Sequence, residues 1–218
     1  MFDLPLFPLG SVLFPGMTNS LYIFEDRYKL MINTCLEQRK PFGWVLIEEG
    51  REALGPLARP YRIGCTAQVF RVQPMEQGTM NITIVGQDRF EIKSLHYNQE
   101  YLSGTVELYP LERKHPDRIQ RHEQRLRPLV ERYLSILAKA EDLEFDPLQL
   151  PADPVEFAYL SAAILQQINN QQKQRLLSLP GASRLLSEIH TIYHREVALL
   201  DMMAQRADNP TNEPFSLN

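Results

Sequence analysis

The sequence lacks the short motifs with which many enzymes bind a phosphate group or activate a nucleophile. None of its ten glycines is followed by lysine, so it has no phosphate-binding loop of the type Gly-x-x-x-x-Gly-Lys. It also has no Gly-x-Ser-x-Gly, Cys-x-x-Cys, Gly-x-Gly-x-x-Gly or His-Glu-x-x-His sequence. We therefore expect no catalytic residues, no metal and no cofactor, and a protein that is not an enzyme.

Cysteine is scarce and long apolar runs are missing. The only two cysteines, Cys35 and Cys65, lie in segments with apolar patterns, which predicts buried, reduced thiols and no disulfide. No segment approaches the length needed to cross a bilayer, and Met-Phe-Asp-Leu-Pro is unlike the start of a signal peptide. These observations predict a cytoplasmic protein with no membrane partner.

The chain also has no excess of positive charge. Its 23 Lys and Arg residues face 27 Asp and Glu residues, a formal net charge of −4, which disfavours nucleic acid as the main partner. One basic run lies over 113–132 and consists of Arg113, Lys114, Arg118, Arg121, His122, Arg125, Arg127 and Arg132. Acidic residues are interleaved with it, which is typical of a solvated helix face; contact with phosphate or with an acidic partner is the alternative.

What is present in the first half is a strand-rich pattern. The stretch Leu4–Met17 has two apolar runs broken by proline and glycine, which predicts an edge strand, a turn and a second strand. A helix then begins at Asp26, its expected cap, and ends near Gln38. Further strands are expected over 41–47, 65–72, 80–85, 89–95 and 102–108, with a mobile polar loop over 48–60. This order predicts a mostly antiparallel sheet, closed or half closed.

The second half changes to helical periodicity after Pro110. Asp117 is the expected cap of a long helix that Pro128 kinks or breaks. Asp153, followed by proline and then by a glutamate three residues after the cap, predicts another helix start. A short helix capped by Asn169 or Asn170 and a last long helix follow, and 207–218 is expected to be a disordered tail. The last helix can pack within the monomer or across a homodimer, and the sequence leaves both open.

Several segments together resemble one known family. Leu4-Pro-Leu-Phe-Pro-Leu9, Val12-Leu-Phe-Pro-Gly16 and Phe24-Glu-Asp-Arg-Tyr28 resemble the opening of the N-terminal, substrate-binding domain of the ATP-dependent Lon protease. Gly86-Gln-Asp-Arg-Phe90 and Asp153-Pro-Val-Glu-Phe157 resemble later parts of that domain, and the similarity extends to about Arg206. The resemblance implies an α+β fold: a mostly antiparallel PUA-like β-barrel domain over 1–112, followed by a C-terminal α-helical bundle over 113–206.

The resemblance also implies a function. Since the ATPase and protease motifs are missing, the chain resembles only the recognition module, and we expect non-covalent binding of protein segments. An apolar groove between sheet and helices would take exposed hydrophobic stretches of unfolded proteins, with an ATP-dependent protease or another protein as partner. The alternatives are an RNA-binding PUA-like protein and a small-molecule-binding domain.

The candidate peptide-binding residues are methionines, one tryptophan and two arginines near predicted loops and strand ends: Met17, Arg27, Trp44, Met75, Met80 and Arg89. Methionine adapts to varied apolar partners, whereas loop methionines and Trp44 can equally belong to the core. Arg27 and Arg89 can point into a cleft or form structural ion pairs. His190 and His194 are four residues apart and could ligate a metal, but no third ligand is evident, so two helix histidines without a metal are expected.

Overall fold

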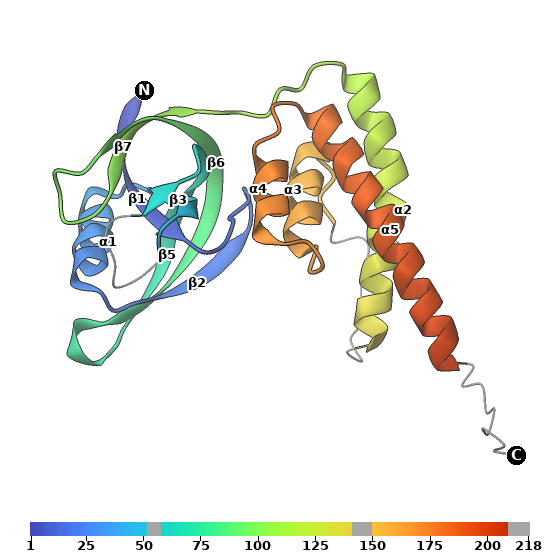
Figure 1. Cartoon of the computed structure of the whole chain (residues 1–218), viewed down its shortest axis with the longest axis horizontal. Coiled ribbons are helices and arrows are strands. Elements are labelled where there is room, and N and C mark those ends of the chain that lie inside the picture. Colours follow the sequence, from blue (N-terminus) through green and yellow to red (C-terminus); the bar gives the residue numbers. More distant parts are fainter. Residues whose placement is uncertain (52–57, 141–149, 209–218) are drawn as a thin grey trace, which may run out of the picture.

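The structure of the protein, a computed structural model, describes residues 1–51, 58–140 and 150–208. Strands occupy one end of the molecule and four helices the other, with one further helix beside the strands (Figure 1). The predicted tail was wrong at residues 207 and 208, which belong to the last helix, and its remainder lies outside the described residues. Part of the predicted loop at 48–60 also lies outside them.

Most of the strands form a closed sheet. The strands are β1 Phe2–Leu9, β2 Thr18–Ile23, β3 Phe42–Glu49, β4 Arg59–Pro60, β5 Ile63–Pro74, β6 Met80–His96 and β7 Ser103–Leu108. Their order is β1-β7-β6-β5-β3-β4, and a pairing of β1 with β3 closes the sheet. All pairs are antiparallel except that between β1 and β3, which confirms the predicted mostly antiparallel sheet. Of the two forms left open by the sequence, closed and half closed, the sheet has the closed one.

The prediction that the first strand lies at an edge was wrong. Residues 2–5 of β1 pair with β7, and Leu6–Leu9 pair with β3 on the other side. Proline has no N–H group to donate to a neighbouring strand. Because each half of β1 pairs on one side only, the sequence of this strand tolerates Pro5 and Pro8 inside a closed sheet.

The two strands predicted over 80–85 and 89–95 are one long strand, β6. Gly86 lies in its middle and approaches the loop after β1 so closely that a Cβ atom there would lie 2.4 Å from the Phe14 carbonyl oxygen. The apolar alternation breaks at Gly86 because the backbone of the loop lies too close to β6 for a side chain at this position. The strand itself continues through the glycine. The residues before it also pair with β2, which runs antiparallel to β6.

The helix α1 (Asp26–Gln38) covers the barrel as predicted and buries Tyr28, Met31, Ile32 and Cys35. Its cap differs from the prediction, because Glu25 occupies the capping position and no side chain there accepts a hydrogen bond. The carbonyl group of Glu25 instead accepts from the backbone N–H groups of Tyr28 and Lys29. Arg27 forms an ion pair with Glu25 at 2.8 Å, which agrees with the structural alternative given for Arg27.

The second half consists of helices α2 (Pro116–Ala140), α3 (Pro154–Ile164), α4 (Asn170–Leu177) and α5 (Ala182–Asp208). The predicted cap Asp153 is confirmed, since it accepts hydrogen bonds from the backbone N–H groups of Val155 and Glu156. Of the two alternatives Asn169 and Asn170, the cap of α4 is Asn169, which accepts from the Gln172 N–H group. Asp117 is not a cap, because α2 already begins at Pro116 and the His115 carbonyl group accepts its first hydrogen bonds. The helix continues through Pro128 without a break.

The helices and the sheet share part of one core. The largest cluster of buried side chains comes mainly from the helices, but it includes Val12, Phe14 and Leu46 from the strand half. The predicted α+β fold with C-terminal helices is thus confirmed. The ranges 1–112, 113–206 and 207–218 stay a prediction as domains, because this core spans the boundary at 112.

Both cysteines are buried free thiols, as predicted. Burial raises the pKa of Cys35 to about 11, and it raises the pKa of Cys65 still further above the ordinary value. Among the helices that the structure describes, none is both long and apolar enough to span a membrane.

Candidate functional site

A groove of about 840 Å³ lies between the two halves of the molecule. Its sheet side consists of the loop between β1 and β2 and the middle of β6, and its other wall is α3. Volumes of this size are typical of binding pockets. We call it the interface groove, and its lining residues are Pro15, Gly16, Met17, Thr18, Gln87, Asp88, Arg113, Pro151, Val155, Glu156, Tyr159, Leu160, Ala163 and Ile164.

The sheet side of the groove is held by backbone hydrogen bonds. The Gly16 N–H group donates to the Gly86 carbonyl oxygen at 2.8 Å, and the Gly86 N–H group donates to the Met17 carbonyl oxygen at 2.9 Å. Gly16 has φ +79°, a left-handed conformation that favours glycine. These contacts fix the loop against β6 and place the half-buried Met17 at the groove.

The helical wall is a second apolar face of α3. Phe157, Ala158 and Ala162 of this helix belong to the core, whereas Leu160, Ala163 and Ile164 are only half-buried and line the groove. Tyr159 lies between these faces, and its ring centroid is 6.4 Å from that of Phe14. Burial raises the pKa of Tyr159 to about 12, so it stays an uncharged phenol at neutral pH.

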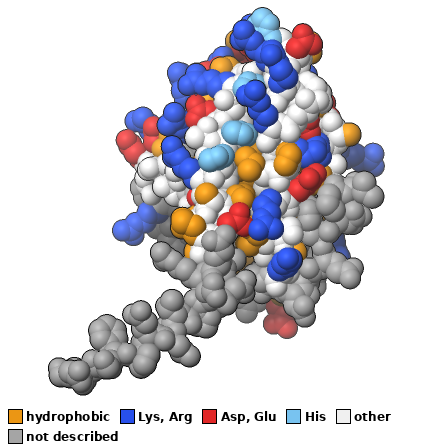
Figure 2. Space-filling model, turned by 90° about the vertical axis from the view of Figure 1, so that its right-hand side faces the viewer, with side chains coloured by type: hydrophobic (Ala, Val, Ile, Leu, Met, Phe, Trp, Pro, Cys, Tyr) orange, Lys and Arg blue, Asp and Glu red, His pale blue; other side chains and the backbone are white. Residues whose placement is uncertain are grey.

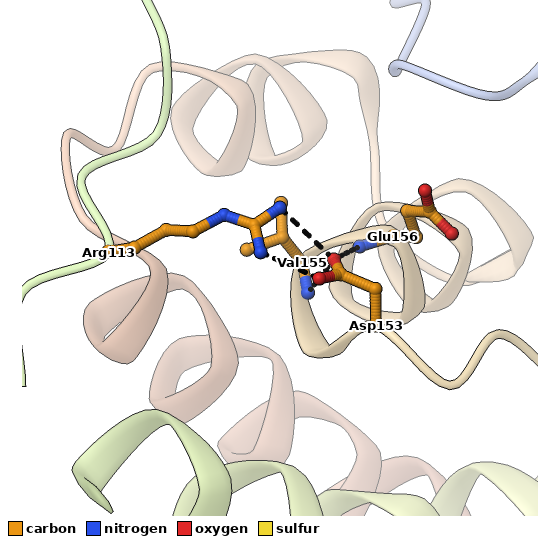
Figure 3. A network of polar contacts seen from close by, with 4 residues as sticks. All are labelled: Arg113, Asp153, Val155 and Glu156. Atoms are coloured by element: carbon orange, nitrogen blue, oxygen red, sulfur yellow. Dashed lines mark hydrogen bonds and ion pairs between the residues drawn. The ribbon is translucent and has the colours of Figure 1, made fainter. Parts of the chain in front are cut away.

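One end of the helical wall carries a network of polar contacts (Figure 3). Arg113, in the connection between β7 and α2, donates two hydrogen bonds to the carboxylate of Asp153, at 2.6 and 3.2 Å. One oxygen of that carboxylate also accepts from the backbone N–H groups of Val155 and Glu156. Burial alone would raise the pKa of Asp153, but these hydrogen bonds outweigh it and hold the pKa below its usual value. The groove therefore has a fixed, polar end beside its apolar wall.

A buried arginine ties the sheet to the helices next to the groove. Arg89 is 2% exposed, and its Nη1 donates to the carbonyl oxygens of Leu177 and Leu179, at 2.5 and 2.7 Å. Its guanidinium lies over the ring of Tyr109, 4.8 Å from the centroid. Burial lowers the pKa of Arg89. This side chain holds the segment between α4 and α5 against β6.

The structure does not bring the six candidate peptide-binding residues together. Of these six, Met17 alone lines the interface groove. Met75 is exposed at the turn between β5 and β6, and Arg27 lies at the start of α1, paired with Glu25. Trp44, Met80 and Arg89 are buried, and the Trp44 indole donates to the Ser11 carbonyl oxygen at 2.8 Å. Because these three side chains are buried, they contact other parts of the protein and offer no exposed surface to a peptide.

Sequence reasoning missed the helical wall of the groove. Val155, Leu160, Ala163 and Ile164 fit the apolar stripe expected of a core helix, and nothing local separates a core position from a groove position. One signal was available, because α3 is apolar around most of its circumference and a helix of that kind has neighbours on more than one side.

No metal site takes shape in the described ranges, where no group of three or more His, Cys, Asp and Glu residues is placed to hold an ion. The rings of His190 and His194 lie 6.3 Å apart on α5.

Comparison with known proteins identifies the family. The family model described as the ATP-dependent protease La (LON) substrate-binding domain matches residues 3–195, and the chain therefore belongs to this family. The resemblance seen in the sequence is thus confirmed.

The similar curated proteins are Lon proteases. The chain is 24% identical over 215 residues to that of Parabacteroides distasonis, covering 92% of this chain and 25% of the relative. It is 29% identical over 107 residues to that of Roseiflexus castenholzii, covering 49% of this chain and 13% of the relative. The chain thus spans a quarter or less of the length of these two relatives.

Solved structures show the same fold. The N-terminal domain of the Mycobacterium avium complex Lon protease matches with a TM-score of 0.69 and 18% identity, covering 88% of this chain and 98% of that one. A Lon N-terminal domain protein from Xanthomonas campestris matches with a TM-score of 0.61 and 21% identity, covering 87% and 97% of the two chains.

Proposed function

We propose that this protein binds exposed apolar segments of unfolded proteins in the interface groove. The observation that carries the proposal is the apolar wall of α3, where Leu160, Ala163 and Ile164 are half-buried and line the groove together with Met17. Membership of a substrate-binding family supports recognition of protein substrates as the general task.

The chemistry of the groove suits a peptide better than a small polar molecule. An unfolded protein differs from a folded one by its exposed apolar side chains, and such side chains gain free energy by leaving water for an apolar wall. Polar side chains at the edge, among them Thr18, Gln87 and Glu156, can hydrogen-bond the backbone of a bound segment. The flexible side chain of Met17 can adapt to different apolar residues.

The test compares one client in two states. A client with permanently reduced and blocked cysteines stays unfolded, and its native form is the matched control. We expect the unfolded form to bind, measured by fluorescence anisotropy, and the native form not to bind. Equal binding of both forms, or no binding of either, would contradict the proposal.

Substitutions locate the binding surface. Leu160→Gln places a polar amide in the wall and should weaken binding of the unfolded client roughly tenfold, since about 1–2 kcal/mol of apolar contact is lost. Met75→Gln changes an exposed apolar residue elsewhere and serves as the control. Weakening by Met75→Gln with none by Leu160→Gln would move the binding surface to the turn between β5 and β6.

We further propose that the chain acts by binding alone and that an ATP-dependent protease or another partner acts on the bound client. The purified chain should then hydrolyse neither ATP nor the client, and turnover of either by the chain alone would contradict this role.

The exposed Leu199, Met202 and Met203 near the end of α5 are the candidate contact of a homodimer, which sedimentation of wild type and Met203→Gln would test.

A further inference from the structure

The connection before α2 presents side chains to two different sites. Arg113 lines the interface groove, whereas its neighbours Glu112 and Lys114 line a separate hollow of about 430 Å³ where α2 and α5 begin. This hollow also includes His115, Arg118, His122 and Arg184. It therefore collects Lys, Arg and His side chains from the connection before α2, from α2 and from α5.

The cationic surface continues from the hollow along the pair of helices. Arg118, His122 and Arg125 have the spacing of one face of α2, and His190 of α5 lies close enough to His122 to help lower its pKa, after burial and Arg125. Figure 2 shows Lys, Arg and His side chains gathered over the upper part of this side of the molecule. We call this surface the basic face; it consists of Lys114, His115, Arg118, His122, Arg125, Arg184, His190 and His194. It holds four of the five histidines of the chain.

Carboxylates of the described residues neutralise little of this positive charge. Lys114 pairs with Glu112 at 2.9 Å, and Arg184 has only a long contact of 3.8 Å with Glu188. Within residues 1–51, 58–140 and 150–208, no carboxylate lies within ion-pair distance of Arg118 or Arg125. Further along α2, Arg127 pairs with Glu123 and Arg132 pairs with Asp201. Within the basic run, Arg113, Lys114, Arg127 and Arg132 are thus paired with carboxylates, whereas Arg118 and Arg125 form no ion pair with a described carboxylate.

We propose that the basic face is a second binding site, separate from the interface groove, and that it binds acidic segments of proteins. Its charge is complementary to a run of Asp and Glu side chains, and arginines can hold carboxylates through paired hydrogen bonds. Histidines at the centre add charge when a bound carboxylate favours their protonated form.

An acidic protein segment suits this face better than a nucleic acid. Proteins that bind single strands combine cationic side chains with exposed aromatic rings that stack on bases. The exposed aromatic side chains among the described residues, which include Tyr22, Phe24, Phe70 and Tyr97, all belong to the strand half. The net charge of −4 also opposes a polyanion that extends beyond the face.

The experiment uses the full chain and three probes. These are a synthetic peptide in which glutamate alternates with serine, its counterpart with glutamine, and an oligodeoxythymidylate of the same charge as the glutamate peptide. We expect the glutamate peptide to bind, to lose affinity as salt is added, and to bind more tightly than the other two probes. Absence of binding at low salt, or tighter binding of the oligonucleotide, would overturn the proposal.

Matched variants locate the site. Arg118→Gln with Arg184→Gln should weaken binding of the glutamate peptide roughly tenfold, because two charge contacts are lost. Arg62→Gln with Arg71→Gln removes the same charge from the strand half and should change affinity less than about twofold. Leu160→Gln should leave this affinity unchanged, which separates the site from the groove. Equal losses in the two double variants, or no loss in the first, would overturn the assignment, and circular dichroism of each variant verifies its fold.

Discussion

At the scale of single residues, Asp153 combines two tasks that the sequence suggested only in part. It caps α3, as the sequence predicted, and it also receives the side chain of Arg113 from forty residues earlier. A cap is a local feature, since its acceptor lies two and three positions from its donors. The pairing with Arg113 is not local, and no spacing in the sequence indicates it. The residue therefore fixes both the start of α3 and the end of the groove.

Substitutions separate these two tasks. Asn at this position can still accept the capping hydrogen bonds but loses the ion pair, so Asp153→Asn should cost less than about 1 kcal/mol of unfolding free energy. Asp153→Ala loses both and should cost about 1–2 kcal/mol. Urea unfolding at neutral pH measures the difference. Equal stabilities of the Asn and Ala variants would show that the cap contributes nothing.

The same carboxylate gives a pH dependence of known sign. Because folding lowers the pKa of Asp153, its contribution is present above the unfolded value of about 4 and is lost as the pH falls through the folded pKa. The stability difference between wild type and Asp153→Asn should therefore shrink below about pH 4. A difference that grows on acidification would contradict the lowered pKa.

At the scale of elements, the loop between β1 and β2 owes its position to β6. The loop and the strand exchange two backbone hydrogen bonds at Gly86, and the space for a side chain there is already filled by the Phe14 carbonyl group. The loop carries Met17, so the geometry of the groove depends on the absence of a side chain at one strand position. From the sequence pattern, a strand was predicted to end just before this glycine.

A methyl group at this position tests the dependence. Gly86→Ala should destabilise the protein by about 2 kcal/mol, because the loop must move away from the strand. It should also weaken binding of an unfolded client, since Met17 moves with the loop. Gly181→Ala is the control, as a Cβ there meets nothing closer than 3.9 Å. Thermal unfolding and anisotropy measure both effects; an unchanged midpoint for Gly86→Ala would contradict the close approach.

At the scale of the whole molecule, the sheet and the helices are joined by a shared core and by Arg89. The guanidinium reaches across the boundary to the carbonyl groups of Leu177, the last residue of α4, and of Leu179, two residues further on. The groove exists because these contacts hold the two halves at one relative position while leaving the wall of α3 partly open. The shape of the candidate site therefore depends on the relative position of the sheet and the helices as well as on the residues that line the groove.

Removal of the Arg89 side chain should weaken the contact between β6 and the end of α4. Arg89→Met keeps most of the side-chain volume but leaves the Leu177 and Leu179 carbonyl groups without their donor, which should cost roughly 2–4 kcal/mol. Arg59→Met, which removes an exposed partner of Glu48, should cost less than about 1 kcal/mol. Urea unfolding compares them. In the Arg89→Met variant, amide hydrogens of α4 and of the start of α5 should exchange faster than in wild type. A variant as stable as wild type would contradict the proposed role of Arg89 in holding the sheet and the helices together.

The α+β order, the cap at Asp153, the helix that covers the barrel and the burial of both cysteines could be predicted from the sequence, which also narrowed the cap of α4 to Asn169 or Asn170. These features depend on neighbours within a few residues or on the period of apolar side chains, which the order of residues contains directly. Long-range packing places β1 inside a closed sheet, continues β6 through Gly86, and puts Leu160 at a groove and Trp44 in the core. Each of these depends on contacts between distant segments, and the same local pattern is compatible with either outcome until the chain has folded.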